Sequence, residues 1–340
     1  MNKKIERKSN FELLRIICMI MIVILHTLGH GGALDGTSIG NYNFIIVNLL
    51  ESISIVGVNC YVIISGFFNI KSSFRLHKIL KIYVEVIFYS VSIFLIFFLF
   101  KISTLTLKDF LQAIFPIIMQ TWWFVSIFLV LYILSFYINK LLIVLSLREY
   151  TILNIVMFLV FVMWPSIPKA VPIDNESGYS LYYFIFLYII GAYIRLFFYD
   201  LKIKKTLTLS IYIVTGILLA LFNIFTSYIL DRAYGKYSYN FGLVFIMSVA
   251  LFLFFKEIEI KNTYINKISS LTFGVYLIHD NPLVRNVIYK CFNYKNYFNK
   301  NNFLIYTIAI VLFIFICSIL IELLRKKFFE FLNRIRGKYE

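Results

Sequence analysis

Two ionisable residues, Arg15 and His26, lie inside the first long apolar stretch of the chain, which reads FELLRIICMIMIVILHTL. A helix turns by about 100° per residue, so the eleven steps from Arg15 to His26 make about three full turns, and the two side chains point in nearly the same direction. The helical rise separates the two side chains by roughly 16 Å, about half the thickness of a hydrocarbon core. Ionisable groups in a membrane helix are costly unless they face protein, water or substrate. The spacing therefore predicts a polar helical face inside the membrane, where this protein works.

Histidine is the side chain best suited to accept and return a proton near neutral pH. We take His26 as the candidate general base. The chain has four histidines, and His26, His30 and His279 all fall at the outer ends of predicted spans. His279 is a second catalytic candidate, which either orients His26 or holds substrate. Glu51, in the second span, is our candidate for the carboxylate that orients the imidazole, as an acid does in a histidine-centred triad.

Each of these residues also has a plainer interpretation. Glu12 lies three residues before Arg15 and can pair with it across one turn near the inner interface. His26 can be an interfacial histidine bonded to a backbone carbonyl, and His279 can be an interfacial histidine beside Asp280. The shared face of Arg15 and His26 favours the functional interpretation over these.

The sequence indicates no metal site. His26 and His30 have the i, i+4 spacing of a metal-ligand pair, but no third ligand is evident near them. The four cysteines show no CxxC spacing, so neither a disulfide framework nor a zinc site is predicted.

The elements that position these residues are membrane helices. The chain is 61% hydrophobic and 15% charged, and its apolar residues come in long blocks. The first block ends without a small-residue cleavage site, so we expect a retained span and not a removed signal peptide. We predict an all-α, polytopic membrane protein with a single domain over residues 1–340 and about ten transmembrane helices: 11–29, 43–68, 79–100, 121–142, 150–164, 181–198, 206–228, 240–255, 268–284 and 302–324.

The net charge of +16 comes from lysines and arginines that are distributed along the chain as in a membrane protein. With the N-terminus inside, most of the 33 lysines and arginines fall in the inner segments, which predicts that both termini are cytoplasmic. The basic tail, residues 325–340, fits an anchor for inner-leaflet lipids. This placement favours membrane lipids over nucleic acid as the partner of the positive charge.

Four segments carry a resemblance to a known family. NFELLRIICMIMIVILH at 10–26 resembles the opening of the acyltransferase-3 family, membrane acyltransferases of cell-surface glycans, whose signature is an arginine, ten residues and a histidine. IISGFF at 63–68, TWWFVSIFLVLY at 121–132 and LTFGVYLIH at 271–279 resemble further family elements, the last with its Tyr-x-x-His. The pieces occur in the family's order and cover most of the chain.

The resemblance implies transfer of an acetyl group, or a larger acyl group, from cytoplasmic acyl-CoA to a sugar hydroxyl. The expected donor is acetyl-CoA, and the expected acceptor is a bacterial surface polysaccharide or its lipid-linked precursor. The expected location is the bacterial cytoplasmic membrane, with other glycan-synthesis proteins among the expected partners. Many relatives carry an extracytoplasmic domain, and none is visible in this sequence, so we expect a stand-alone membrane domain.

A cytoplasmic acyl-CoA needs cations at the inner face to bind its phosphates. Arg75, Lys78 and Lys81 have helical i, i+3 spacing and form a candidate basic ridge for this purpose. Arg15, facing inward at similar depth, is a candidate for holding a pantetheine carbonyl or a phosphate. The alternative use of the lysines is topology and contact with anionic lipid.

Aromatic side chains at the outer interface are candidates for the acceptor site. Trp122 and Trp123 begin the fourth span, and Tyr276 precedes His279 by one helical turn. Aromatic faces stack on sugars, although interfacial anchoring is the usual role of such tryptophans. Asn59 and the Ser65–Gly66 pair in the second span are assigned to helix packing.

Two other classes of function remain open on the sequence. A transporter or flippase for a glycan intermediate would also line a polar path with Arg15, His26 and Glu51. Against it, the sequence shows neither repeated halves nor paired Gly/Pro-broken helices. A protein with a structural role in a glycan-synthesis complex would use the polar helical face of Arg15 and His26 only for helix association.

Overall fold

The computed structural model describes residues 8–167, 177–231, 235 and 237–336, so the last four residues of the predicted basic tail lie outside it. Every regular element in these ranges is helical, which confirms the all-α class. The helices are α1 (Ser9–Gly29), α2 (Ala33–Gly36), α3 (Tyr42–Ser54), α4 (Gly57–Asn69), α5 (Leu76–Leu99), α6 (Leu107–Ile114), α7 (Trp123–Val144), α8 (Leu147–Phe158), a π-helical segment (Leu159–Met163), α9 (Trp164–Ser166), α10 (Leu181–Phe197), α11 (Lys205–Leu230), α12 (Gly242–Lys256), α13 (Thr263–Ser269), α14 (Thr272–His279), α15 (Pro282–Cys291), a 3₁₀ turn (Tyr294–Tyr297) and α16 (Phe303–Arg336).

The helices have the lengths that a polytopic membrane protein needs. In the described part of the chain, seven helical segments are long and apolar enough to cross a bilayer, counting α3 with α4 and α8 with the turns after it. α10 and α12 are shorter apolar helices of 17 and 15 residues. These elements confirm the predicted polytopic class.

The predicted span 268–284 is not one continuous helix. α13 ends at Ser269, α14 occupies Thr272–His279, and α15 begins at Pro282. Pro282 stands at the first turn of α15, where its missing N–H costs nothing, and the Asn281 side chain accepts a hydrogen bond from the backbone N–H of Leu283 at 3.0 Å. The break leaves polar side chains at the end of α14, inside the protein.

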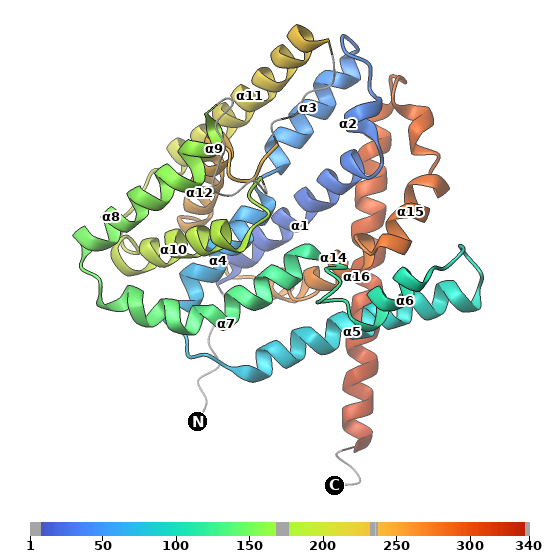
Figure 1. Cartoon of the computed structure of the whole chain (residues 1–340), viewed down its shortest axis with the longest axis horizontal. Helices are drawn as coiled ribbons and strands as arrows, with labels where there is room; N and C mark the ends of the chain where they lie inside the picture. The colour runs from blue at the N-terminus through green and yellow to red at the C-terminus, as the bar shows by residue number, and fades with distance from the viewer. Residues whose placement is uncertain (1–7, 168–176, 232–234, 236, 337–340) are drawn as a thin grey trace.

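α1 lies at the centre of the helix assembly (Figure 1). It contacts α3, α4, α12, α13, α14 and α16, so protein surrounds it on several sides. Its apolar residues Leu14, Cys18 and Val23 are completely buried. Polar residues on α1 therefore face other helices or the space between them, as the spacing of Arg15 and His26 predicted.

α4 and α10 pack backbone against backbone. A Cβ atom on Gly66 would lie 2.0 Å from the carbonyl oxygen of Tyr188, and one on Gly191 would lie 2.1 Å from that of Ile63. Only glycine permits such an approach, which is a common basis of helix association in membranes. The predicted packing role of Gly66 is therefore observed.

Asn59 ties α4 to its neighbours, as predicted. Its Nδ2 donates to the Tyr239 carbonyl oxygen at 2.9 Å and to the Ser248 hydroxyl at 3.1 Å, and it lies 3.2 Å from the Tyr183 hydroxyl. The residue is completely buried. These hydrogen bonds join α4 with α10, α12 and the segment before α12.

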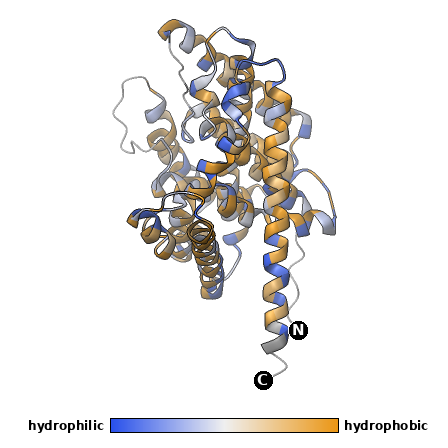
Figure 2. Ribbon diagram, turned by 90° about the vertical axis from the view of Figure 1, so that its right-hand side faces the viewer, coloured by the Kyte–Doolittle hydropathy of each residue, from blue (hydrophilic) through white to orange (hydrophobic). Residues whose placement is uncertain are grey.

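α16 carries a buried ionic cluster where it meets α5. Arg325 pairs with Glu85 of α5 at 3.1 Å and with Glu322 at 2.6 Å, and the Tyr89 hydroxyl donates to Glu322 at 2.6 Å. Figure 2 shows α16 apolar over most of its length, with hydrophilic residues toward the C-terminal end that projects beyond the other helices.

Candidate functional site

His26 lies in the last turn of α1 and is hydrogen-bonded to His279 at the end of α14. The His26 Nδ1 and His279 Nε2 atoms are 2.9 Å apart, although the two residues are 253 positions apart in sequence. The continuous apolar run of α1 carries His26 to this depth, and the short α14 ends at His279 because the chain breaks before Pro282. The structure thus brings together the two histidines that the sequence singled out.

The hydrogen bonds of His279 define which nitrogen of His26 carries a proton. His279 Nδ1 lies 2.6 Å from the carbonyl oxygen of Val275, which can only accept, so Nδ1 carries the hydrogen. In the neutral ring, Nε2 of His279 then accepts a hydrogen bond from Nδ1 of His26. Nε2 of His26 is left with its lone pair, and no described residue forms a hydrogen bond with it.

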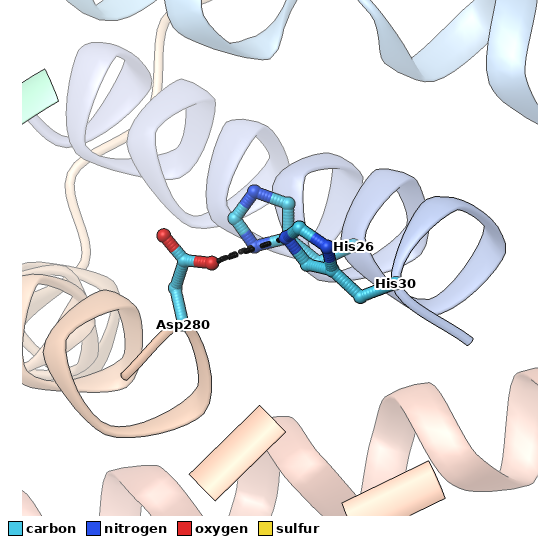
Figure 3. Close-up of side chains that lie close together, drawn as sticks. All are labelled: His26, His30 and Asp280. Carbon is cyan, nitrogen blue, oxygen red and sulfur yellow. Dashed lines mark ion pairs between the residues drawn. The ribbon is translucent and has the colours of Figure 1, made fainter. Parts of the chain in front are cut away.

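Asp280 is the carboxylate that lies beside His26 (Figure 3). Its Oδ1 lies 3.5 Å from His26 Nδ1, 3.4 Å from His30 Nε2 and 3.4 Å from Nη1 of Arg285 on α15. Because this oxygen also accepts, it favours the same tautomer of His26. In the sequence, Asp280 stands out only as a neighbour of His279 and as a charged residue inside a predicted span.

Glu51 does not take the role that the sequence analysis gave it. It is buried on α3, and its Oε2 has no hydrogen-bond partner within the described chain. No ion pair of 4.0 Å or less joins it to His26 in those residues. A position one-third of the way along a span does not fix the direction of a side chain, and here Asp280 occupies the place beside the imidazole.

Arg15 is neutralised at the other end of α1. Its Nη1 lies 2.6 Å from Oε1 of Glu12, and Oε2 of Glu12 accepts a hydrogen bond from Ser269 at 2.5 Å. The Tyr61 hydroxyl donates to the Arg15 carbonyl oxygen at 2.7 Å. The ion pair predicted from the spacing is therefore present, and it is tied to α13 as well. The Arg15 side chain keeps 29% exposure, so it remains accessible to a ligand.

One cavity contains both Arg15 and His26. It has a volume of about 450 Å³, within the usual range for small-molecule sites. Its walls come from α1, α4, α5, α7, α14 and the segment before α12, and its lining residues are Arg15, Met19, Ile22, His26, Val58, Tyr61, Ser65, Ile82, Trp123, Phe124, Val125, Phe128, Tyr239, Thr272, Phe273 and Tyr276. The helical face inferred from the spacing of Arg15 and His26 is thus the wall of an internal space.

Of the aromatic residues predicted for the acceptor site, two line the cavity and one is buried in the core. Trp123 lines the cavity and packs against Tyr179 and Tyr239, with ring centroids 4.5 and 5.9 Å away. Tyr276 also lines it, 6.3 Å from the His26 ring. Trp122 is 1% exposed and does not line this cavity. Adjacent residues point in different directions, and the sequence alone does not say which tryptophan faces inward.

The basic residues before α5 do not form one helical ridge. Arg75 has an extended backbone and precedes the first turn of α5, so helical spacing does not apply to it. Lys78 lies over the ring of Tyr132 on α7, 5.7 Å from its centroid. Ile82, one turn after Lys78, lines the cavity. Lys78 therefore lies one helical turn from a residue of the cavity wall, while Lys81 is exposed and displaced around the helix by about 100° from Ile82.

The fold and the site define a polytopic helical membrane protein with a paired-histidine centre in an internal cavity. A family model described as an acyltransferase domain matches residues 8–322. The chain belongs to the acyltransferase-3 family and is an acyltransferase. Comparison with curated proteins and with solved structures gave no match.

Proposed function

We propose that the protein transfers an acyl group, most simply acetyl, from cytoplasmic acyl-CoA to a hydroxyl of a bacterial surface polysaccharide or its lipid-linked precursor. The observation that carries this proposal is the cavity wall that contains both His26 and Arg15. The site of action is the bacterial cytoplasmic membrane.

His26 is the general base of the proposed reaction. Its Nε2 takes the proton of the sugar hydroxyl as the hydroxyl oxygen attacks the thioester carbonyl. The carbon–sulfur bond then breaks, the acyl–oxygen bond remains, and the CoA sulfur leaves with the proton that His26 returns. The hydrogen bond from His26 Nδ1 to His279 and the nearby Asp280 carboxylate support this direction of proton transfer, because both partners stabilise the imidazolium that forms.

The donor is proposed to enter from the inner side. Arg15, Ser65 and Ile82 line the cavity, and Lys78 lies one helical turn before Ile82 on α5. A cavity of about 450 Å³ accepts the narrow pantetheine arm of CoA but not the whole molecule. The nucleotide phosphates would therefore stay at the inner surface, beside the basic residues, while the thioester reaches toward His26.

The acceptor is proposed to enter from the outer side. Trp123 and Tyr276 line the cavity, Tyr276 with its ring 6.3 Å from that of His26, and both offer aromatic faces to a sugar ring. A flippase without acyl-transfer chemistry is the second candidate, since the same cavity and buried charges would suit a polar path. The oriented His26–His279 pair favours the transferase.

The test compares ester-linked acyl groups on surface glycan by mass spectrometry. A null strain is complemented with the wild-type gene, with His26→Ala or with His77→Ala, which alters a histidine away from the cavity. We expect acylation to disappear in the null strain and to return with the wild type and His77→Ala only. Unchanged acylation in the null strain would refute the enzyme, whereas rescue by His26→Ala would leave an enzyme with another base.

A further inference from the structure

Three side chains at the outer end of α1 are arranged as metal ligands. His26, His30 and Asp280 each present one ligand atom, and these atoms all lie within 4.8 Å of one another (Figure 3). His30 follows α1 directly and keeps helical backbone angles, so its ring lies one turn beyond that of His26, with the ring planes tilted by 45° and the centroids 5.1 Å apart. The third ligand that the sequence lacked is supplied from the distant end of α14.

The two separations from the carboxylate oxygen match tetrahedral coordination. Asp280 Oδ1 lies 3.5 Å from His26 Nδ1 and 3.4 Å from His30 Nε2. A zinc ion with bonds of about 2.0–2.1 Å in tetrahedral geometry sets neighbouring ligand atoms about 3.3–3.4 Å apart. Two imidazoles and one carboxylate are also a ligand set that zinc favours, with a fourth position left open.

A cation already stands among these ligands. Nη1 of Arg285 is 3.4 Å from Asp280 Oδ1 and 3.3 Å from His30 Nε2. The Arg285 side chain is 33% exposed and that of His30 is 38% exposed, so the cluster is reached from outside the protein. Asp280 is buried and carries the only negative charge of the trio, which the arginine balances. A divalent ion would replace that single positive charge.

We propose that His26, His30 and Asp280 form an inhibitory site for a divalent transition-metal ion, with Zn²⁺ as the probe, and that the ion displaces Arg285. Binding requires the lone pair of Nδ1 on His26, so the proton of the neutral ring moves to Nε2 through solvent. Nε2 is the atom that the proposed reaction needs without a proton. The inhibition rests on the function proposed above, whereas the binding does not.

The test measures Zn²⁺ binding to the purified full chain in detergent by competition with a chromophoric chelator. We expect one site per chain, weakened at least about tenfold in His30→Ala, which removes one of the three ligands. Arg285→Ala should bind Zn²⁺ more tightly than the wild type, a gain that misfolding does not produce. His77→Ala and Cys291→Ser are matched controls, because they remove another histidine and an exposed thiol. Mg²⁺, which prefers oxygen ligands, should not compete.

A second arm measures acyl transfer with and without Zn²⁺, each variant relative to its own rate. We expect Zn²⁺ to inhibit the wild type and His77→Ala, and His30→Ala to need at least about tenfold more metal. The site is refuted if the wild type has no stoichiometric Zn²⁺ site, or if His30→Ala binds as the wild type does. Binding without inhibition would refute the tautomer argument, and an absence of acyl transfer in the metal-free protein would refute the proposed function instead.

Discussion

Replacing His279 tests whether it sets the tautomer of His26. His279→Leu removes the acceptor 2.9 Å from His26 Nδ1 and leaves a buried N–H without its main partner. An unsatisfied buried donor costs about 1–3 kcal/mol, and each 1.4 kcal/mol is a factor of ten in rate. We predict a fall in kcat of about 10- to 100-fold. Asp280 Oδ1, at 3.5 Å, limits the loss because it remains as a weaker acceptor.

The conservative variant separates this role from a merely structural one. His279→Gln keeps an acceptor oxygen near the same place, so we predict a kcat within about tenfold of the wild type. The KM values for donor and acceptor should not change in either variant, because His279 does not line the cavity. The assay follows release of the CoA thiol by purified protein, with the unfolding temperature as a control. Equal rates for wild type and His279→Leu, or equal loss in Leu and Gln variants, would refute the reasoning.

Four further substitutions test the cavity wall and the packing of the helices. Trp123→Ala should raise the KM for the acceptor roughly three- to tenfold, because it removes an aromatic wall of the cavity. Trp122→Ala should instead lower the free energy of unfolding by about 3–5 kcal/mol without a specific effect on KM, because Trp122 is buried in the core. Enzyme kinetics and thermal unfolding distinguish the two variants. Arg325→Met should destabilise the protein by about 3–5 kcal/mol, seen as a lower unfolding temperature, because the buried carboxylates of Glu85 and Glu322 both lose their arginine partner. Gly191→Ala should reduce the yield of monodisperse protein in size-exclusion chromatography, because its Cβ would lie 2.1 Å from a backbone oxygen of α4; normal yields would contradict the close contact.

The sequence was sufficient to predict the all-α, polytopic class, because long apolar blocks depend on composition and order alone. It also predicted that Arg15 and His26 share one face, since helical periodicity fixes directions within a single helix. Both residues line the same cavity, as that periodicity requires. The break at Pro282 was not predicted, because hydropathy averages over the few polar residues that interrupt the ninth span.

Contacts between distant segments were beyond the sequence. Asp280 reaches His26 only because α14 ends beside α1, and no spacing rule relates positions so far apart. For the same reason Glu51 was assigned to a role that depends on side-chain direction across two helices. Arg75, Lys78 and Lys81 were treated as one helical ridge, but α5 begins only after Arg75. Propensity does not fix a helix boundary to within one residue.

The central claim is that His26 accepts the proton of the attacking hydroxyl. The most direct measurement is the rate of acyl transfer by His26→Ala in protein reconstituted into lipid vesicles, with acyl-CoA and a soluble acceptor, beside His77→Ala and the wild type. General base catalysis contributes about 10²- to 10⁴-fold, so we predict a loss of that size in His26→Ala with an unfolding temperature near that of the wild type. A well-folded His26→Ala that transfers acyl groups within tenfold of the wild-type rate would contradict the claim.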